Sequence, residues 1–178
     1  FWASKLYSPN DPNHTGNTYN RMMYATTSDF RTFSAAQVWV DKGYSTIDST
    51  LTKHNGTYYR FTKDERSSSQ SACGKFILAE KSATILNRNY SFVADCIGNN
   101  AIRQGEGPLV FKSNTEERWY MFIDEYGGRG YVPFATDVAA EDTETEDVEA
   151  AAAEAEGEVE DPLEEFRKAL WAKPGDWF

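Results

Sequence analysis

Short runs of alternating apolar and polar residues, separated by turn residues, fill the chain from its start to about residue 136. Alternation with a period of two is typical of β-strands, and this part shows no helical period. The dipeptide Asn55-Gly56 between two such runs is a strong hairpin signal. The pattern predicts strands over 1–7, 21–27, 46–54, 57–63, 75–81, 91–96, 107–113, 118–125 and 131–136, with 37–40 opening a connection. We therefore predict an all-β antiparallel meander.

Two acidic residues occupy similar places in two similar segments of this pattern. Asp48 aligns with Glu106 at a step of 58 residues (106 − 48), and Tyr59 aligns with Tyr120 at a step of 61 (120 − 59). An alanine also recurs at matching positions, with steps of 54 and 56. The chain thus consists of strand-built units of roughly 55–60 residues, and a repeat of this kind indicates β-propeller blades.

The predicted units amount to the last part of one blade, one complete blade and most of a third, about two and a half blades in all. Propeller blades bury their faces against their neighbours, so both end blades should remain uncovered. The chain opens on Phe1-Trp2-Ala3-Ser4, which resembles a strand interior and not a signal peptide. We therefore expect the natural N-terminus to lie upstream.

The charge of the chain divides it into two compositions. Residues 1–137 hold 15 basic and 14 acidic residues, a net of +1, whereas residues 138–178 hold 3 basic and 14 acidic residues, a net of −11. Residues 138–160 are mostly Ala, Glu, Asp, Thr and Val, a composition that predicts a disordered linker. Residues 161–170 have the capping and charge pattern of a short helix, and 176–178 would begin a strand.

The sequence contains two cysteines, Cys73 and Cys96. They would form a disulfide in a secreted protein, or lie buried as two thiols otherwise. His14 and His54 have no ligand partner at usable spacing, so we expect no metal site and no cofactor. No apolar run is long enough to cross a membrane.

Asp48 and Glu106 suggest chemistry because equivalent positions on the innermost strands of a propeller converge near its axis. Two carboxylates facing one pocket are what glycoside hydrolysis needs: one acid protonates the leaving oxygen, and one carboxylate activates water or attacks the sugar. Gly105 and Gly107 beside Glu106 would let a sugar approach the backbone closely. The alternative is that both acids are turn or strand-edge residues without chemistry.

Five segments, in order along the chain, resemble the motifs of glycoside hydrolase family 43. They are YATTSDF at 24–30, IDST at 47–50, YYRFTKDE at 58–65, QGEGP at 104–108 and WYMFIDE at 119–125. The resemblance implies a five-bladed propeller that removes α-L-arabinofuranosyl or β-D-xylosyl units from plant polysaccharides with inversion. It also implies roles: Glu106 would be the general acid, and Asp48 would orient it and tune its pKa.

The family's third acid, an Asp base, belongs to the blade before Asp48, and its expected position falls before residue 1. We therefore expect the chain as given to be inactive. Arg60 and Trp119 are candidates for substrate binding; for Trp119 the alternative, which we favour, is a place in a blade core, and Arg60 could instead pair with a carboxylate or face water. The expected partner is an arabinose- or xylose-containing glycan bound by an extracellular monomer, with neither nucleic acid nor membrane. The alternative is a glycan-binding fragment without catalysis.

Residues 138–178 resemble a different protein. The Ala/Glu-rich lead, followed by DPLEEFR at 161–167 and KPGDWF at 173–178, is similar to the N-terminal extension of the transcription elongation and antitermination factor NusG. A sugar hydrolase joined to a transcription factor leader predicts a chimera with its junction at 136–140. The alternative is a natural enzyme followed by an acidic linker.

Overall fold

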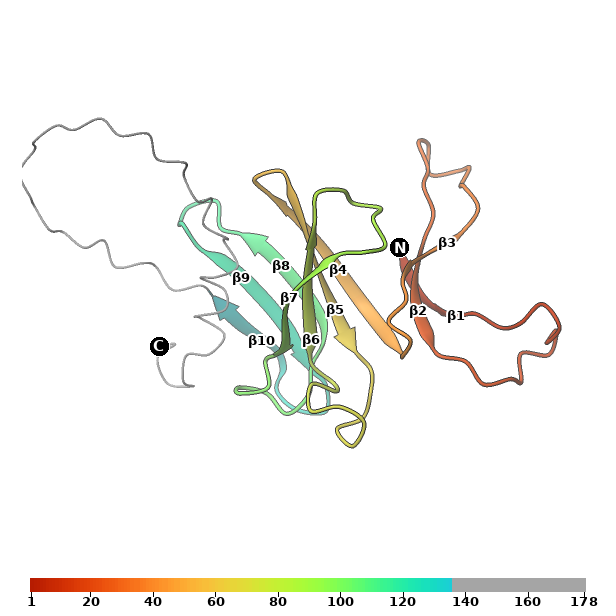
Figure 1. Cartoon of the computed structure of the whole chain (residues 1–178). Helices are drawn as coiled ribbons and strands as arrows, with labels where there is room; N and C mark the ends of the chain where they lie inside the picture. Colours follow the sequence, from red (N-terminus) through yellow and green to blue (C-terminus); the bar gives the residue numbers. More distant parts are fainter. Residues whose placement is uncertain (136–178) are drawn as a thin grey trace, which may run out of the picture.

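The computed structural model describes residues 1–135, and this part of the chain is all-β (Figure 1). Its ten strands form three antiparallel sheets that lie side by side. The first sheet contains β1 (Trp2–Lys5), β2 (Asn20–Tyr24) and β3 (Gln37–Val40). The second contains β4 (Thr46–His54), β5 (Thr57–Asp64), β6 (Ile77–Ser82) and β7 (Ser91–Ile97). The third contains β8 (Glu106–Lys112), β9 (Trp119–Glu125) and β10 (Gly130–Ala135).

The second sheet is a four-stranded meander in which each strand pairs with the next along the chain. Its first hairpin turns at Asn55 and Gly56, whose φ angles of 46° and 79° match the left-handed conformation of the tight turn that these residues favour. The sequence prediction of this hairpin is thereby confirmed. The register continues from His54 opposite Thr57 through Thr50 opposite Phe61.

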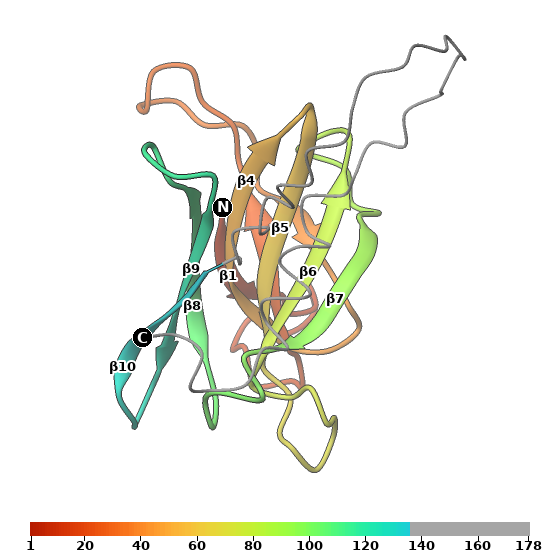
Figure 2. The same cartoon turned by 90° about the vertical axis from the view of Figure 1, so that its left-hand side faces the viewer.

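β5 is covered on both faces, because the second sheet lies between the other two (Figure 1); Figure 2 shows the second sheet beside the third. Tyr59 and Phe61 belong to a core shared with Val110 and Met121 of the third sheet. Tyr58, on the other face of β5, packs against a second core that contains Met22, Trp39 and Val40 of the first sheet. Since side chains alternate along a strand, one short strand contributes to both cores.

Large apolar side chains of the first and third sheets remain exposed. Phe1 and Trp2 are exposed at the start of the chain, with the Phe1 ring centroid 5.0 Å from that of Trp39, and Leu109, Phe111 and Tyr131 are exposed on the third sheet. Phe111 stacks near Tyr120 and Phe122, which gives the third sheet an aromatic outer face. Uncovered end faces agree with the expectation for units that normally pack against further neighbours.

The all-β prediction is confirmed for residues 1–135, and every predicted strand of this part is present within one or two residues at most ends. One assignment was wrong: residues 37–40 form the strand β3, which pairs with β2. The junction at 136–140, the linker 138–160 and the helix 161–170 lie outside the described residues. Within residues 1–135, no helix is long and apolar enough to cross a membrane.

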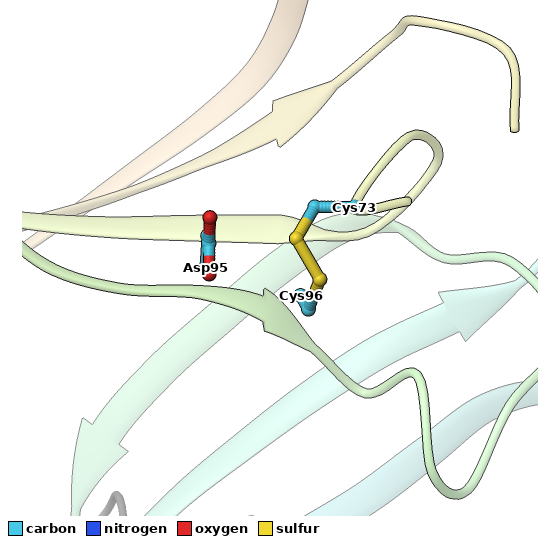
Figure 3. A group of neighbouring side chains, drawn as sticks. All are labelled: Cys73, Asp95 and Cys96. Carbon is cyan, nitrogen blue, oxygen red and sulfur yellow. A yellow bond between two sulfur atoms is a disulfide. The ribbon is translucent and has the colours of Figure 1, made fainter. Parts of the chain in front are cut away.

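Cys73 and Cys96 form a disulfide with a Cα–Cα distance of 4.4 Å (Figure 3). The two cysteines are thus paired, as in the first of the two alternatives. The bond fastens the long loop between β5 and β6 to the end of β7. That loop carries Glu65 and Lys75, which bear on the site described next.

Candidate functional site

Asp48 lies in a bulge of β4. Ile47 pairs with Lys63, and Thr50 pairs with Phe61. The two residues of β4 between these pairs, Asp48 and the residue after it, therefore lie opposite a single residue of β5. The φ angle of Asp48 is 51°, a left-handed conformation that is costly for a residue with a side chain. Strained residues of this kind concentrate at functional sites, so the bulge itself marks Asp48 as a candidate.

The first strand of the third sheet has the same bulge. Glu106 pairs with Asp124 and Leu109 with Phe122, and Gly107 between them has a φ angle of 54°. Because the bulges coincide, Asp48 corresponds to Gly107 and not to Glu106, a step of 59 residues (107 − 48) instead of 58. The sequence alignment was wrong by one residue here, and the two carboxylates do not occupy equivalent positions.

The two carboxylates nevertheless converge, because β4 packs against β8. The backbone N–H of Gly107 donates a hydrogen bond to Asp48 Oδ2 at 3.3 Å, which places the Asp48 carboxylate beside the residue that follows Glu106. Burial raises the pKa of Asp48; the Gly107 amide opposes this shift, and the negative charge of Glu106 adds to it. Asp48 therefore keeps its proton to a higher pH than an ordinary aspartate, because it is half-buried and has a carboxylate for a neighbour.

Lys63 is the site residue that sequence analysis missed. Its side chain is 2% exposed, and Nζ lies 2.7 Å from Glu106 Oε2 and 2.9 Å from Glu65 Oε2. Nζ also lies 4.3 Å from the ring centroid of Tyr126. The pKa of Lys63 is raised: burial lowers it, but hydrogen bonds to Glu106 and Glu65 outweigh the burial. Lys63 follows Tyr59 and Phe61 on the same face of the strand, and a lysine in line with two aromatic residues was the signal that the sequence offered.

Arg60 does not reach the surface. It is 0% exposed, donates a 2.9 Å hydrogen bond to Glu80, and has its guanidinium 3.9 Å from the ring centroid of Tyr90 and 4.9 Å from that of Trp39. Lys42 also pairs with Glu80. This burial argues against the predicted sugar contact of Arg60 and favours the alternative, pairing with a carboxylate.

Trp119 lies far from both acids. It pairs with Lys112, six residues beyond Glu106 along β8 (112 − 106), and at the rise of a strand this separates them by roughly 20 Å. Its ring makes an edge contact with His54 at 5.3 Å between centroids and packs against the core shared by the second and third sheets. The structure thus places Trp119 in the alternative role, as core.

Glycine is needed on the two sides of Glu106 for different structural reasons. A Cβ at position 105 would lie 2.5 Å from the side chain of Ile123, so Gly105 makes room for core packing and not for a sugar. Gly107 is required by its positive φ, and its Cβ position is open apart from the Tyr131 hydroxyl at 3.9 Å. Of the two, Gly107 alone leaves space on the side of the carboxylates.

Two further clusters lie outside this site. A cavity of about 450 Å³ between the β7–β8 loop and the β9–β10 hairpin contains Glu125, whose pKa is lowered to about 2, above all by the hydrogen bond from Arg129. Asp95 lies beside the disulfide, with its carboxylate oxygen within 4.8 Å of the sulfur atoms of Cys73 and Cys96 (Figure 3). Disulfide sulfurs carry no thiolate, so this group lacks the charge that a metal requires.

Two carboxylates that converge on one site are the arrangement that glycoside hydrolases use, and the sequence comparisons point to the same class. Residues 1–160 match the family described as "Probable glycosyl hydrolase domain", which is related to glycoside hydrolase family 43, and the chain belongs to this family. Over 89 residues the chain is 42% identical to an alpha-L-arabinofuranosidase of Bifidobacterium longum subsp. longum. That alignment covers 46% of this chain and 8% of the relative, so the chain spans a small part of that protein.

Proposed function

We propose that this chain is part of an inverting glycoside hydrolase that removes terminal α-L-arabinofuranosyl or β-D-xylosyl units from plant polysaccharides outside the cell. Glu106 serves as the general acid, and Asp48 orients it and tunes its proton affinity. The observation that carries the proposal is the convergence of Asp48 and Glu106 from neighbouring sheets, joined by the Gly107 amide at 3.3 Å. The arabinofuranosidase relative supports the arabinose alternative over xylose.

Inversion requires a third group, a base that activates water on the far side of the sugar. By resemblance this base belongs to a unit before residue 1. The chain of residues 1–178 should therefore bind the terminal sugar without releasing it, as part of a five-bladed propeller that the full protein completes.

The test combines binding with product analysis. The purified chain is titrated with arabinofuranosyl- and xylosyl-terminated oligosaccharides while amide NMR signals are followed, and the solution is analysed for free sugar. We expect the Gly107 signal to shift with one sugar, no free sugar to form, and Asp48→Asn or Glu106→Gln to weaken binding. Release of free sugar would show that no further base is needed. Absence of binding to either sugar would contradict the proposed site.

A second candidate, glycan binding without catalysis, is favoured by the Lys63–Glu106 ion pair of 2.7 Å, which holds the proposed acid against a cation. Restoring the upstream unit distinguishes the two candidates. A hydrolase gains turnover in the longer protein, whereas a binding module stays inactive and retains its affinity.

The origin of residues 138–178 as a transcription factor leader is a separate proposal. The family match runs to residue 160, 23 residues beyond residue 137 (160 − 137), and this favours the alternative of an enzyme with an acidic linker for that part. A single long read of source DNA across the junction tests it. One uninterrupted reading frame would contradict the chimera.

A further inference from the structure

The burial of the Lys63 ammonium is energetically unfavourable unless nearby groups compensate its charge. A buried ammonium loses its hydration, and the loss is offset only when carboxylates and other acceptors surround it. Two carboxylates and one aromatic face do so here: Glu106, Glu65 and Tyr126. Glu106 itself is 33% exposed on its side chain, so the ion pair connects a buried cation to a carboxylate that opens toward solvent.

The contacts of Lys63 continue into a closed circuit. Glu65 Oε1 lies 2.6 Å from Lys75 Nζ, which also donates to the carbonyl of Glu65 at 3.0 Å. The carbonyl of Lys75 in turn accepts a 2.7 Å hydrogen bond from the N–H of Gly105, the residue before Glu106. The Glu106 carboxylate is therefore tied through Lys63, Glu65 and Lys75 back to its own backbone.

The circuit rests on a fixed loop. Lys75 has a φ angle of 71°, a left-handed conformation that the surroundings must enforce. Two residues before it, Cys73 is joined by the disulfide to Cys96 at the end of β7. The amide of Lys75 also donates to the carbonyl of Asp64 at 2.8 Å. A strand end, a loop and a disulfide thus fix the far side of the circuit.

We propose that Lys63 is a positioning residue that aims the Glu106 carboxylate at the sugar and, by sharing its charge with Glu65, lets Glu106 change protonation state without leaving a buried ammonium unpaired. This inference rests on the proposed role of Glu106. When Glu106 gains a proton, Lys63 keeps Glu65 as its counter-charge. When Glu106 loses its proton to a leaving oxygen, Lys63 again binds the new carboxylate.

The charged and titratable groups around Glu106 act in opposing directions. Glu106 has charges of both signs beside it: Lys63 Nζ at 2.7 Å and the Asp48 carboxylate on β4. The remaining groups facing the circuit are Glu65 and Lys75 from the β5–β6 loop, Asp124 from β9 and Tyr126 after β9. Removing Lys63 and removing Glu65 should therefore move the titration of Glu106 in opposite senses.

The test follows the Glu106 carboxyl carbon by NMR as pH is varied, in the chain of residues 1–178, with Glu106→Gln used to assign the signal. In Lys63→Met we expect Glu106 to titrate at a pH higher by about one unit or more, because an adjacent opposite charge is lost. In Lys63→Arg the charge remains and the midpoint should stay near its original pH. In Glu65→Gln Lys63 has one competitor fewer, so Glu106 should titrate at lower pH.

The matched control is Lys112→Met. Lys112 Nζ lies 2.7 Å from Glu117 Oε2, the same separation as in the Lys63 pair, but Glu117 is 88% exposed. Its titration should move much less, since water screens an exposed pair. An unchanged Glu106 midpoint in Lys63→Met overturns the inference. If Lys63→Met fails to fold, the sign of the Glu65→Gln shift decides, and a shift to higher pH overturns it.

This readout separates the inference from the function on which it rests. If the sugar does not bind but the predicted titration shifts are observed, the hydrolase site is refuted and the charge circuit stands. Sugar binding without the titration shifts refutes the role of Lys63 and leaves the hydrolase site intact.

Discussion

Arg60 and Lys63 lie three residues apart on β5, and both are buried cations. The spacing sends them to opposite faces of the strand, because side chains alternate. Arg60 enters the core shared with the first sheet, where Glu80 and two aromatic rings enclose it. Lys63 lies on the face of the third sheet and reaches Glu106 and Glu65, which are 33% and 26% exposed on their side chains.

The difference lies in the partners and not in the cations. The Arg60 pair is sealed: the side chain of Glu80 is 2% exposed, so water cannot reach the two charges. The Lys63 pair ends on carboxylates that water and ligands can reach. A sealed pair can only support the fold, whereas a buried cation with an accessible partner can also hold and tune that partner. The following predictions separate these two uses.

The largest effect is expected from opening the sealed pair. Glu80→Leu leaves the guanidinium of Arg60 buried without its counter-charge, with Lys42 close by, and should lower the free energy of unfolding by about 3–5 kcal/mol. Urea denaturation followed by circular dichroism measures the change. The matched control is Glu117→Leu, which opens an exposed pair and should cost about 1 kcal/mol or less. Equal costs in the two variants would refute the distinction.

The disulfide comes next in size. Cys73 and Cys96 close a loop with a sequence separation of 23, and a bond over such a loop is worth about 3 kcal/mol in the chain-entropy description. Cys73→Ser with Cys96→Ser should therefore destabilise the chain by this amount. Urea unfolding of the original chain with and without a reducing agent provides an independent measurement. A double variant that unfolds at the same urea concentration as the original chain would contradict the anchoring role.

Replacing Lys63 should cost less stability than replacing Glu80. Lys63→Met removes the ion pair of Glu106, whereas Glu65 keeps its ion pair with Lys75; both carboxylates are partly exposed and can bind water. We expect a loss of about 1–2 kcal/mol in the free energy of unfolding. The same urea measurement applies, with Lys112→Met as the exposed counterpart. A loss as large as that of Glu80→Leu would show that Lys63 is mainly structural.

The smallest effect concerns the pH dependence of stability and has opposite signs for two acids of the candidate site, Asp48 and Glu65. Burial raises the pKa of Asp48 above 3.8, so its contribution to stability is present below that pH and is lost as pH rises through the folded value. Burial also acts to raise the pKa of Glu65, but Lys75 and Lys63 outweigh it and lower the pKa below 4.5. The contribution of Glu65 is therefore present above pH 4.5 and is lost as pH falls.

Unfolding of Asp48→Asn and Glu65→Gln at pH values from acid to neutral checks these signs. Relative to the original chain, Asp48→Asn should gain stability as pH rises, whereas Glu65→Gln should be less stable near neutral pH and approach the original chain in acid. Parallel pH profiles of the two variants would contradict the assigned environments.

Much of the fold was predictable because strands with turn residues between them leave a local signal. The Asn55-Gly56 hairpin and the strand that follows it were located by residue type alone. β3 was missed because its residues Val38 to Val40 form an apolar run without alternation, and its pairing with β2 depends on the other strand. The site was predicted in part, since Asp48 and Glu106 were named and are brought close together.

By itself the sequence determined the all-β class, the order of the strands, the two carboxylates and the pair of cysteines, because each depends on residue type and local spacing. Only the tertiary structure decided that Asp48 lies opposite Gly107, that Arg60 is sealed and that Lys63 holds Glu106. A bulge shifts the register by one residue without changing composition. The face on which a buried charge meets its partner depends on which sheet packs there, and that packing is not encoded in any local pattern.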